Sequence, residues 1–143
     1  MNYLTTREEL EAHPDYLVFD CRFALTDKEI GRRQFLEAHI PGAQYADLDQ
    51  HLSGAPGDGG RHPLPDPAAF LAQVRQWGIG NDDHVVCYDA NNGAFAARLW
   101  WMLRWLGHGA VTVLNGGFDA WTSAGLTTDQ AIVRGAISTK KGM

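Results

Sequence analysis

The sequence predicts an α/β domain: a central parallel sheet of about five strands with helices on both faces. Three observations lead to this expectation. Short apolar runs rich in β-branched residues alternate along the chain with segments of helical periodicity. The apolar runs are continuous instead of alternating with polar residues, which is typical of strands buried on both faces of a parallel sheet. The length of 143 residues suits one domain with one core.

The N-terminal part predicts one short helix and the first strand. Thr5 as N-cap and Glu8 three residues later have the spacing of a capping box, so a helix should follow and end before Pro14. Residues 16–20 are rich in β-formers and predict a buried strand that ends at an aspartate. Residues 24–34 are charged and lack an apolar period, so we expect a loop with a single helical turn.

The next part contains weaker signals and one clear helix. A short helix around residues 35–36 and a short strand at residues 44–46 flank a Pro-Gly turn. Residues 53–60 (SGAPGDGG) have the composition of a flexible surface loop. Residues 65–67 (Pro-Asp-Pro) should open a helix that stops at Gly78.

The centre of the chain gives the strongest predictions. A buried strand at residues 84–88 leads through a loop into a helix at residues 96–106. A third buried strand follows at residues 111–114, and the last helix runs from residue 118 to about Gly125. We expect residues 1–127 to form the domain. Residues 128–143 have no periodicity and predict a linker-like or disordered tail.

Composition excludes several classes of function. The net charge of −5 and the lack of a Lys/Arg-rich run argue against a nucleic-acid surface. No apolar segment is long enough to span a membrane, and no signal-peptide pattern opens the chain, so a reducing cytoplasm is the expected location. Cys21 and Cys87 lie in apolar runs and are expected to be buried thiols. Neither zinc-ligand spacing nor a P-loop or GxGxxG fingerprint is present, so no metal or cofactor is expected.

The loop after the central strand is the first candidate site. It lies between a buried strand and a helix, where ligands of open α/β sheets bind. Its small residues would let backbone amides surround a small anion. An ordinary strand-to-helix turn explains the same residues equally well. The loop residues are Asp89, Ala90, Asn91, Asn92 and Gly93.

Several motifs in order resemble the rhodanese family. Residues 85–121 (VVCYDANNGAFAARLWWMLRWLGHGAVTVLNGGFDAW) are similar to the N-terminal domain of the two-domain thiosulfate and 3-mercaptopyruvate sulfurtransferases. The resemblance extends upstream through LVFDCRF, AHIPGA, ADLD and GRHPLP, and it covers roughly residues 5–126. It implies a rhodanese-like α/β domain.

The resemblance also implies that this chain lacks the family's nucleophile. In the working domain a cysteine opens a C-x-x-G-x-[RT] loop, and its thiolate takes a sulfane sulfur as a persulfide. Here Asp89 occupies that position, as in the non-catalytic N-terminal domains. No catalytic residue is therefore expected on this chain, which should be inactive alone. Cys87 lies two residues earlier, within the strand, where desolvation should keep it unreactive.

Other candidate residues follow from the resemblance. His62 and Asp49 match positions that assist mercaptopyruvate turnover, although a solvated loop histidine is the alternative reading of His62. Phe23 matches an aromatic position that faces the partner domain's cysteine, and Arg22 could approach the same cleft. Three residues are expected to be structural: Asp20, His39 and Arg98.

Two hypotheses of function remain open, with a third ranked last. The first is a sulfurtransferase half that acts on a small sulfur-containing anion and needs a C-terminal catalytic domain. The second is a stand-alone, non-catalytic rhodanese-homology domain with a binding or regulatory role. A phosphatase would need a C-x5-R loop, which is absent. An outward-facing tryptophan among Trp100, Trp101 and Trp105, together with Phe118 or Trp121, is expected to form the docking surface or to cause self-association.

Overall fold

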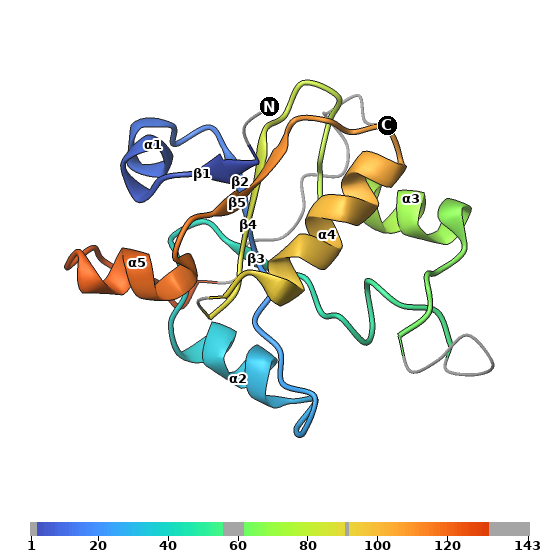
Figure 1. Ribbon diagram of the computed structural model, residues 1–143, viewed down its shortest axis with the longest axis horizontal. Coiled ribbons are helices and arrows are strands. Elements are labelled where there is room, and N and C mark those ends of the chain that lie inside the picture. Colours follow the sequence, from blue (N-terminus) through green and yellow to red (C-terminus); the bar gives the residue numbers. More distant parts are fainter. Residues whose placement is uncertain (1–2, 56–61, 91, 132–143) are drawn as a thin grey trace.

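Five parallel strands form a single sheet in the order β1-β5-β4-β2-β3 within the described residues, which are 3–55, 62–90 and 92–131 of the computed structural model. The strands are β1 (Leu4–Thr5), β2 (Leu17–Asp20), β3 (Gln44–Tyr45), β4 (Val85–Tyr88) and β5 (Val111–Leu114). Figure 1 shows the sheet between two helical layers. One layer contains α3 (Pro67–Gln76) and α4 (Ala94–Trp105); the other contains α1 (Arg7–Ala12), α2 (Ile30–Glu37) and α5 (Gly117–Ser123). The predicted fold class is confirmed.

The central strand β4 shows why the apolar runs are continuous. All four of its residues are buried. Val85 and Cys87 pack into the cluster beneath α3 and α4, whereas Val86 and Tyr88 pack beneath α1, α2 and α5. A strand with helices on both faces has no solvent side, so both sets of alternating side chains must be apolar.

The N-terminal boundary differs from the prediction by one residue. Thr5 is not the helix cap; it belongs to β1, which pairs with β5 through Leu4–Val113 and Thr5–Leu114. Thr6 is the cap instead, and its hydroxyl accepts the Glu9 N–H at 3.1 Å. Two adjacent threonines fit the same local motif, and the long-range strand pairing selects the second one.

Helix α2 begins inside the segment that was predicted to be a loop. It spans Ile30–Glu37, with Gly31 and Phe35 as its buried residues. The helix packs so close to the end of β2 that a Cβ on Gly31 would lie 1.9 Å from the Arg22 carbonyl oxygen. Only glycine permits this approach. Because a glycine fills one of two core positions, the sequence carries little apolar periodicity here.

The remaining helices lie close to their predicted positions. Asp66 caps α3 by accepting the Ala68 and Ala69 N–H groups at 3.1 and 3.2 Å. Helix α4 starts two residues earlier than predicted and α5 one residue earlier. Among the described helices, even the 12-residue α4 falls short of the length and apolarity that a membrane crossing requires.

The first residues of the predicted tail are tied to the domain. Asp129 and His39 exchange two backbone hydrogen bonds of 2.8 and 2.9 Å as an isolated antiparallel bridge. The Trp121 indole donates to the Thr127 carbonyl at 2.8 Å, and the Gln130 amide donates to the Glu37 carbonyl at the same distance. The chain therefore continues along α2 as far as residue 131, and the rest of the predicted tail, residues 132–143, lies outside the described residues.

A buried ion pair joins both central strands to α2. Asp20 is fully buried at the end of β2 and accepts hydrogen bonds from the Arg22 guanidinium and from the Tyr88 hydroxyl of β4. The same guanidinium donates to the Ala38 carbonyl at the end of α2 at 2.6 Å. The charges are compensated inside the core, so removing either partner leaves the other uncompensated.

Asp20→Asn should lower the free energy of unfolding by about 3–5 kcal/mol, because Arg22 would stay buried without its counter-charge. Urea unfolding followed by tryptophan fluorescence measures the change. Asp27→Asn is the matched control, since Asp27 pairs with Arg33 at the surface and its loss should change stability little. Equal effects of the two substitutions would contradict this account of the ion pair.

Candidate functional site

Asp89 lies at the carboxyl end of β4, where the parallel sheet opens toward the loop and α4. Its side chain is turned inward, and the residue is only 2% exposed. One carboxylate oxygen accepts the Gly93 N–H, and the other accepts the Phe95 and Ala96 N–H groups, all at 2.9 Å. Phe95 and Ala96 belong to the first turn of α4, whose N–H groups have no partner within the helix. The Asp89 side chain therefore caps α4, although the residue precedes the helix in the sequence by several positions.

The loop has the shape of an anion cradle, but it already contains an anion. Gly93 takes a positive φ of 83°, which turns the chain into α4 and supplies no capping side chain. The amides that converge here are hydrogen-bonded to the Asp89 carboxylate. Ala90 and Asn92 are exposed, and the Asn92 side chain accepts the Ala94 N–H; Asn91 lies outside the described residues. The loop thus binds its own carboxylate where a free anion was expected.

Asp49 and His62 come together beside this region, although they belong to different loops. The His62 Nε2 lies 3.6 Å from a carboxylate oxygen of Asp49, and the Lys28 ammonium lies 3.5 Å from the other oxygen. The His62 side chain is 15% exposed and is therefore not a solvated loop histidine. A carboxylate at this distance can orient the imidazole ring.

Two aromatic rings form the apolar side of this pair. The Phe23 ring meets His62 edge-on, with centroids 5.8 Å apart, and meets Phe95 at 5.6 Å. Phe95 was not singled out from the sequence, although its place in the first turn of α4, next to the Asp89 loop, is a usable signal. The four side chains form one site, hereafter the Asp49–His62 site: Phe23, Asp49, His62 and Phe95.

Arg98 holds the backbone of this site in place. Its guanidinium donates to the carbonyls of Leu52, His62 and Pro63 at 2.9, 3.0 and 3.3 Å. One arginine on the rigid helix α4 therefore fixes the loop that presents the His62 imidazole.

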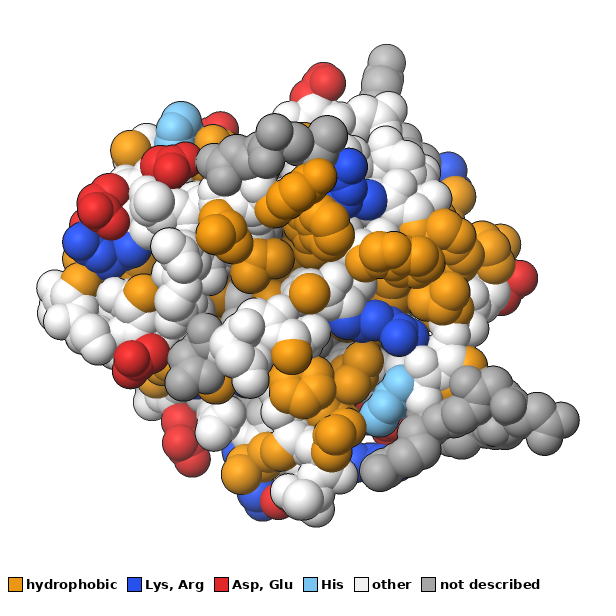
Figure 2. All heavy atoms as spheres, viewed as in Figure 1, with side chains coloured by type: hydrophobic (Ala, Val, Ile, Leu, Met, Phe, Trp, Pro, Cys, Tyr) orange, Lys and Arg blue, Asp and Glu red, His pale blue; other side chains and the backbone are white. Residues whose placement is uncertain are grey.

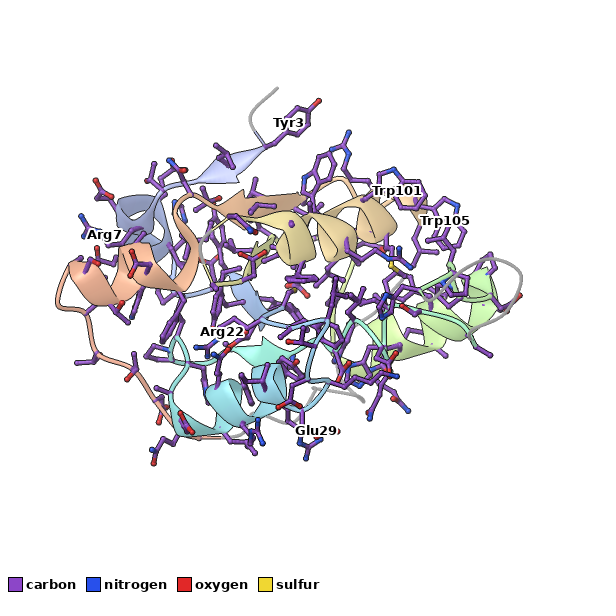
Figure 3. All side chains as sticks on the ribbon, turned by 60° about the horizontal axis from the view of Figure 1, so that its bottom comes forward. Tyr3, Arg7, Arg22, Glu29, Trp101 and Trp105 are labelled. Carbon is purple, nitrogen blue, oxygen red and sulfur yellow. The ribbon has the colours of Figure 1, made fainter. Side chains whose placement is uncertain are left out.

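Arg22 does not face this site. It is 6% exposed, and its guanidinium pairs with Asp20 and lies 4.1 Å above the Phe118 ring. Figure 3 shows its side chain inside the molecule, between α2 and the sheet. The next residue along the chain, Phe23, reaches the Asp49–His62 site, because consecutive side chains at the end of an extended strand point to opposite faces.

His39 is packed in the core. It is fully buried and stacks on Phe35 with ring centroids 4.1 Å apart. Its Nδ1 lies 2.7 Å from the Phe35 carbonyl oxygen.

Both cysteines are free thiols in the core. Cys21 and Cys87 are at most 1% exposed and pack beneath α3 and α4. Burial, followed by the neighbouring Cys87 thiol, raises the pKa of Cys21 well above the usual thiol range. A thiolate is the reactive form, so Cys21 carries little nucleophilic character at neutral pH. Across the described residues no group of three His, Cys, Asp or Glu side chains is placed to hold a metal ion.

The exposed tryptophans do not lie on one surface with Phe118 or Trp121, as the sequence led us to expect. Trp101 and Trp105 are 46% and 38% exposed and stack on each other on the outer side of α4, with ring centroids 5.9 Å apart (Figure 3). Trp121 is buried in the opposite helical layer, and Phe118 packs against the same cluster. A surface that combines α4 with α5 is therefore wrong, because the sheet separates the two helices.

Comparison with known proteins finds a rhodanese-like domain model and relatives that are named sulfurtransferases. A model described as "Rhodanese-like domain" matches residues 6–124. "Probable 3-mercaptopyruvate sulfurtransferase" of Pseudomonas aeruginosa is 48% identical over 145 residues, which cover 97% of this chain and 50% of that protein. Thiosulfate sulfurtransferase of Bos taurus is 40% identical over 114 residues, covering 78% of this chain and 38% of that protein.

A solved structure agrees with these relatives. The 3-mercaptopyruvate sulfurtransferase from Leishmania major superposes with a TM-score of 0.86 at 33% identity. The match covers 99% of this chain and 41% of that one. The chain spans at most half the length of these three relatives.

Cys21 and Cys87 should resist an aromatic disulfide reagent in the folded chain at mildly alkaline pH, because both are buried and the pKa of Cys21 is raised. Absorbance of the released thiolate measures the rate, and both thiols should react at once in concentrated urea. Rapid labelling of Cys87 without denaturant would show a reactive thiol and contradict this expectation.

Proposed function

Because the chain belongs to the family of rhodanese-like domains, we propose that it serves as the non-catalytic half of a tandem-domain sulfurtransferase. The observation that carries the proposal is the Asp89 carboxylate, bound to three backbone N–H groups at the place where the family's nucleophilic cysteine is expected. A carboxylate cannot form a persulfide and repels an anionic donor. The second half of the enzyme would then supply the cysteine.

The Asp49–His62 site suits the part of the reaction that needs a proton. When a cysteine thiolate attacks the sulfur of 3-mercaptopyruvate, the carbon–sulfur bond breaks and a persulfide forms. The electron pair of that bond stays on carbon as the enolate of pyruvate, which must take up a proton. His62, oriented by Asp49, would donate that proton, while Phe23 and Phe95 would exclude water from the cleft.

The partner half would cover apolar surface on this domain. Figure 2 shows hydrophobic side chains gathered over α4 and beside it, with basic and histidine side chains among them. Trp101 and Trp105 are the large exposed rings on α4 itself. Stacked, exposed tryptophans are typical of a protein contact surface. The same surface would serve a different partner if the domain had only a binding role.

Thiosulfate:cyanide and mercaptopyruvate assays of the chain alone should give no turnover, because no thiol lies at residue 89. Adding the other half of the Pseudomonas aeruginosa relative, which the proposal expects to supply the cysteine, should restore turnover, and the same half with that cysteine changed to serine should not. Turnover by the chain alone would overturn the proposal. Failure of a folded C-terminal half to restore any turnover would favour the stand-alone binding role.

His62→Gln and Asp49→Asn should lower kcat/KM for mercaptopyruvate in the mixed enzyme by about 100-fold, the usual contribution of general acid catalysis. Turnover of thiosulfate should change little, because sulfite leaves without needing a proton. His13→Gln and Asp15→Asn are matched controls, since this exposed pair lies 3.9 Å apart and outside the site. Equal losses with both donors would assign the Asp49–His62 site a structural role instead.

A further inference from the structure

A cavity lies at the β3 edge of the sheet, where the two helical layers meet. Its volume is about 200 Å³. Strand β3 pairs only with β2 among the described strands, so its other side is open to the helices. The Gln44 side chain of β3 donates to the Trp77 carbonyl at 3.0 Å and ties the end of α3 to this edge. None of the residues that line the cavity belongs to the Asp89 loop or to the Asp49–His62 site.

The walls of this cavity are largely apolar, and one positively charged side chain, that of Arg32, also lines it. Phe35 and Leu36 of α2 and the Trp77 ring form the apolar lining. Arg32 lines the same cavity one turn earlier on α2. Its neighbour Arg33 pairs with Asp27 at 2.7 Å, whereas Arg32 has no hydrogen-bond or ion-pair partner in the part of the chain that the structure describes. An arginine beside an apolar hollow can bind a carboxylate through two N–H groups.

His51 adds a neutral hydrogen-bond donor to the cavity. Its Nδ1 accepts the Asp47 backbone N–H at 2.9 Å, so the neutral ring carries its proton on Nε2. Burial, together with the positive charge of Arg32, outweighs Asp47 and lowers the pKa of His51, which keeps the ring neutral near pH 7. The ring meets Trp77 edge-on at 5.5 Å, which fixes its orientation. The Nε2–H makes no hydrogen bond to another described residue.

We propose that this cavity binds a small organic carboxylate with a compact apolar body. The carboxylate pairs with the Arg32 guanidinium and accepts a hydrogen bond from His51, and the apolar body packs against Leu36 and Trp77. The volume limits the body to about the size of one ring or a short branched chain, since pockets for larger ligands are roughly 300–1,000 Å³. The proposal is independent of sulfur transfer, because the cavity shares no residue with the Asp49–His62 site.

A titration of the full chain with benzoate, followed by ¹H–¹⁵N NMR, tests the proposal. Saturable shifts are expected at the Trp77 indole, the His51 ring and the Arg32 amide. Arg32→Gln should weaken binding about tenfold or more, because a charged hydrogen-bonded pair is lost. Arg33→Gln is the matched control: it makes the same change one residue along the same helix but should leave the affinity unchanged.

Benzamide, the neutral analogue of benzoate, distinguishes carboxylate recognition from simple apolar binding. Benzamide should bind the natural chain at least about tenfold more weakly than benzoate does. The Arg32→Gln variant should bind benzamide and benzoate with about equal affinity. Equal affinity of benzoate and benzamide for the natural chain would overturn the proposal. So would equal effects of Arg32→Gln and Arg33→Gln, or a lack of saturable shifts around the cavity in the folded protein.

Discussion

The open end of this sheet depends on one carboxylate. Asp89 accepts three backbone N–H groups that would otherwise be unsatisfied at the start of α4, and its backbone carbonyl accepts the Phe118 N–H at the start of α5. The partial positive charge of the α4 N-terminus adds to this stabilisation. The loop amides that the rhodanese resemblance would assign to a thiolate are hydrogen-bonded here to a carboxylate of the chain itself. An amide that donates to the Asp89 carboxylate is not free to bind another anion.

The Asp49–His62 site is attached to the same helix that Asp89 caps. Arg98 projects from α4 and holds three loop carbonyls, so the imidazole of His62 is placed by the helix that Asp89 caps. The Asp89 loop and the loop that carries His62 are therefore both attached to α4. In the proposed tandem enzyme, this domain would contribute one wall and a proton donor to a cleft whose reactive cysteine comes from the other half.

The sequence predicts those elements whose signal is local. The runs at β4 and β5 and the period of α3 and α4 identify them, because each buries several apolar side chains at regular spacing. Helix α2 is not predicted in full because Gly31 occupies one of its buried positions and weakens the apolar period. Strand β1 is not predicted because its two residues are held by pairing with a strand more than a hundred positions away. The position of Asp89 follows from the family resemblance, but its inward rotation and the burial of Arg22 are set by hydrogen bonds that no periodicity encodes.

The two backbone hydrogen bonds between His39 and Asp129 connect the C-terminal end of the described chain to the core. Tension at residue 131 would reach the Gln130–Glu37 hydrogen bond and this pair of backbone hydrogen bonds before it reached the sheet. The residue before His39 is Ala38, whose carbonyl accepts the Arg22 guanidinium. A pull on the chain would therefore be transmitted within a few bonds to the buried charges at the end of β2, so that the segment around residue 129 and the rigidity of this core are linked.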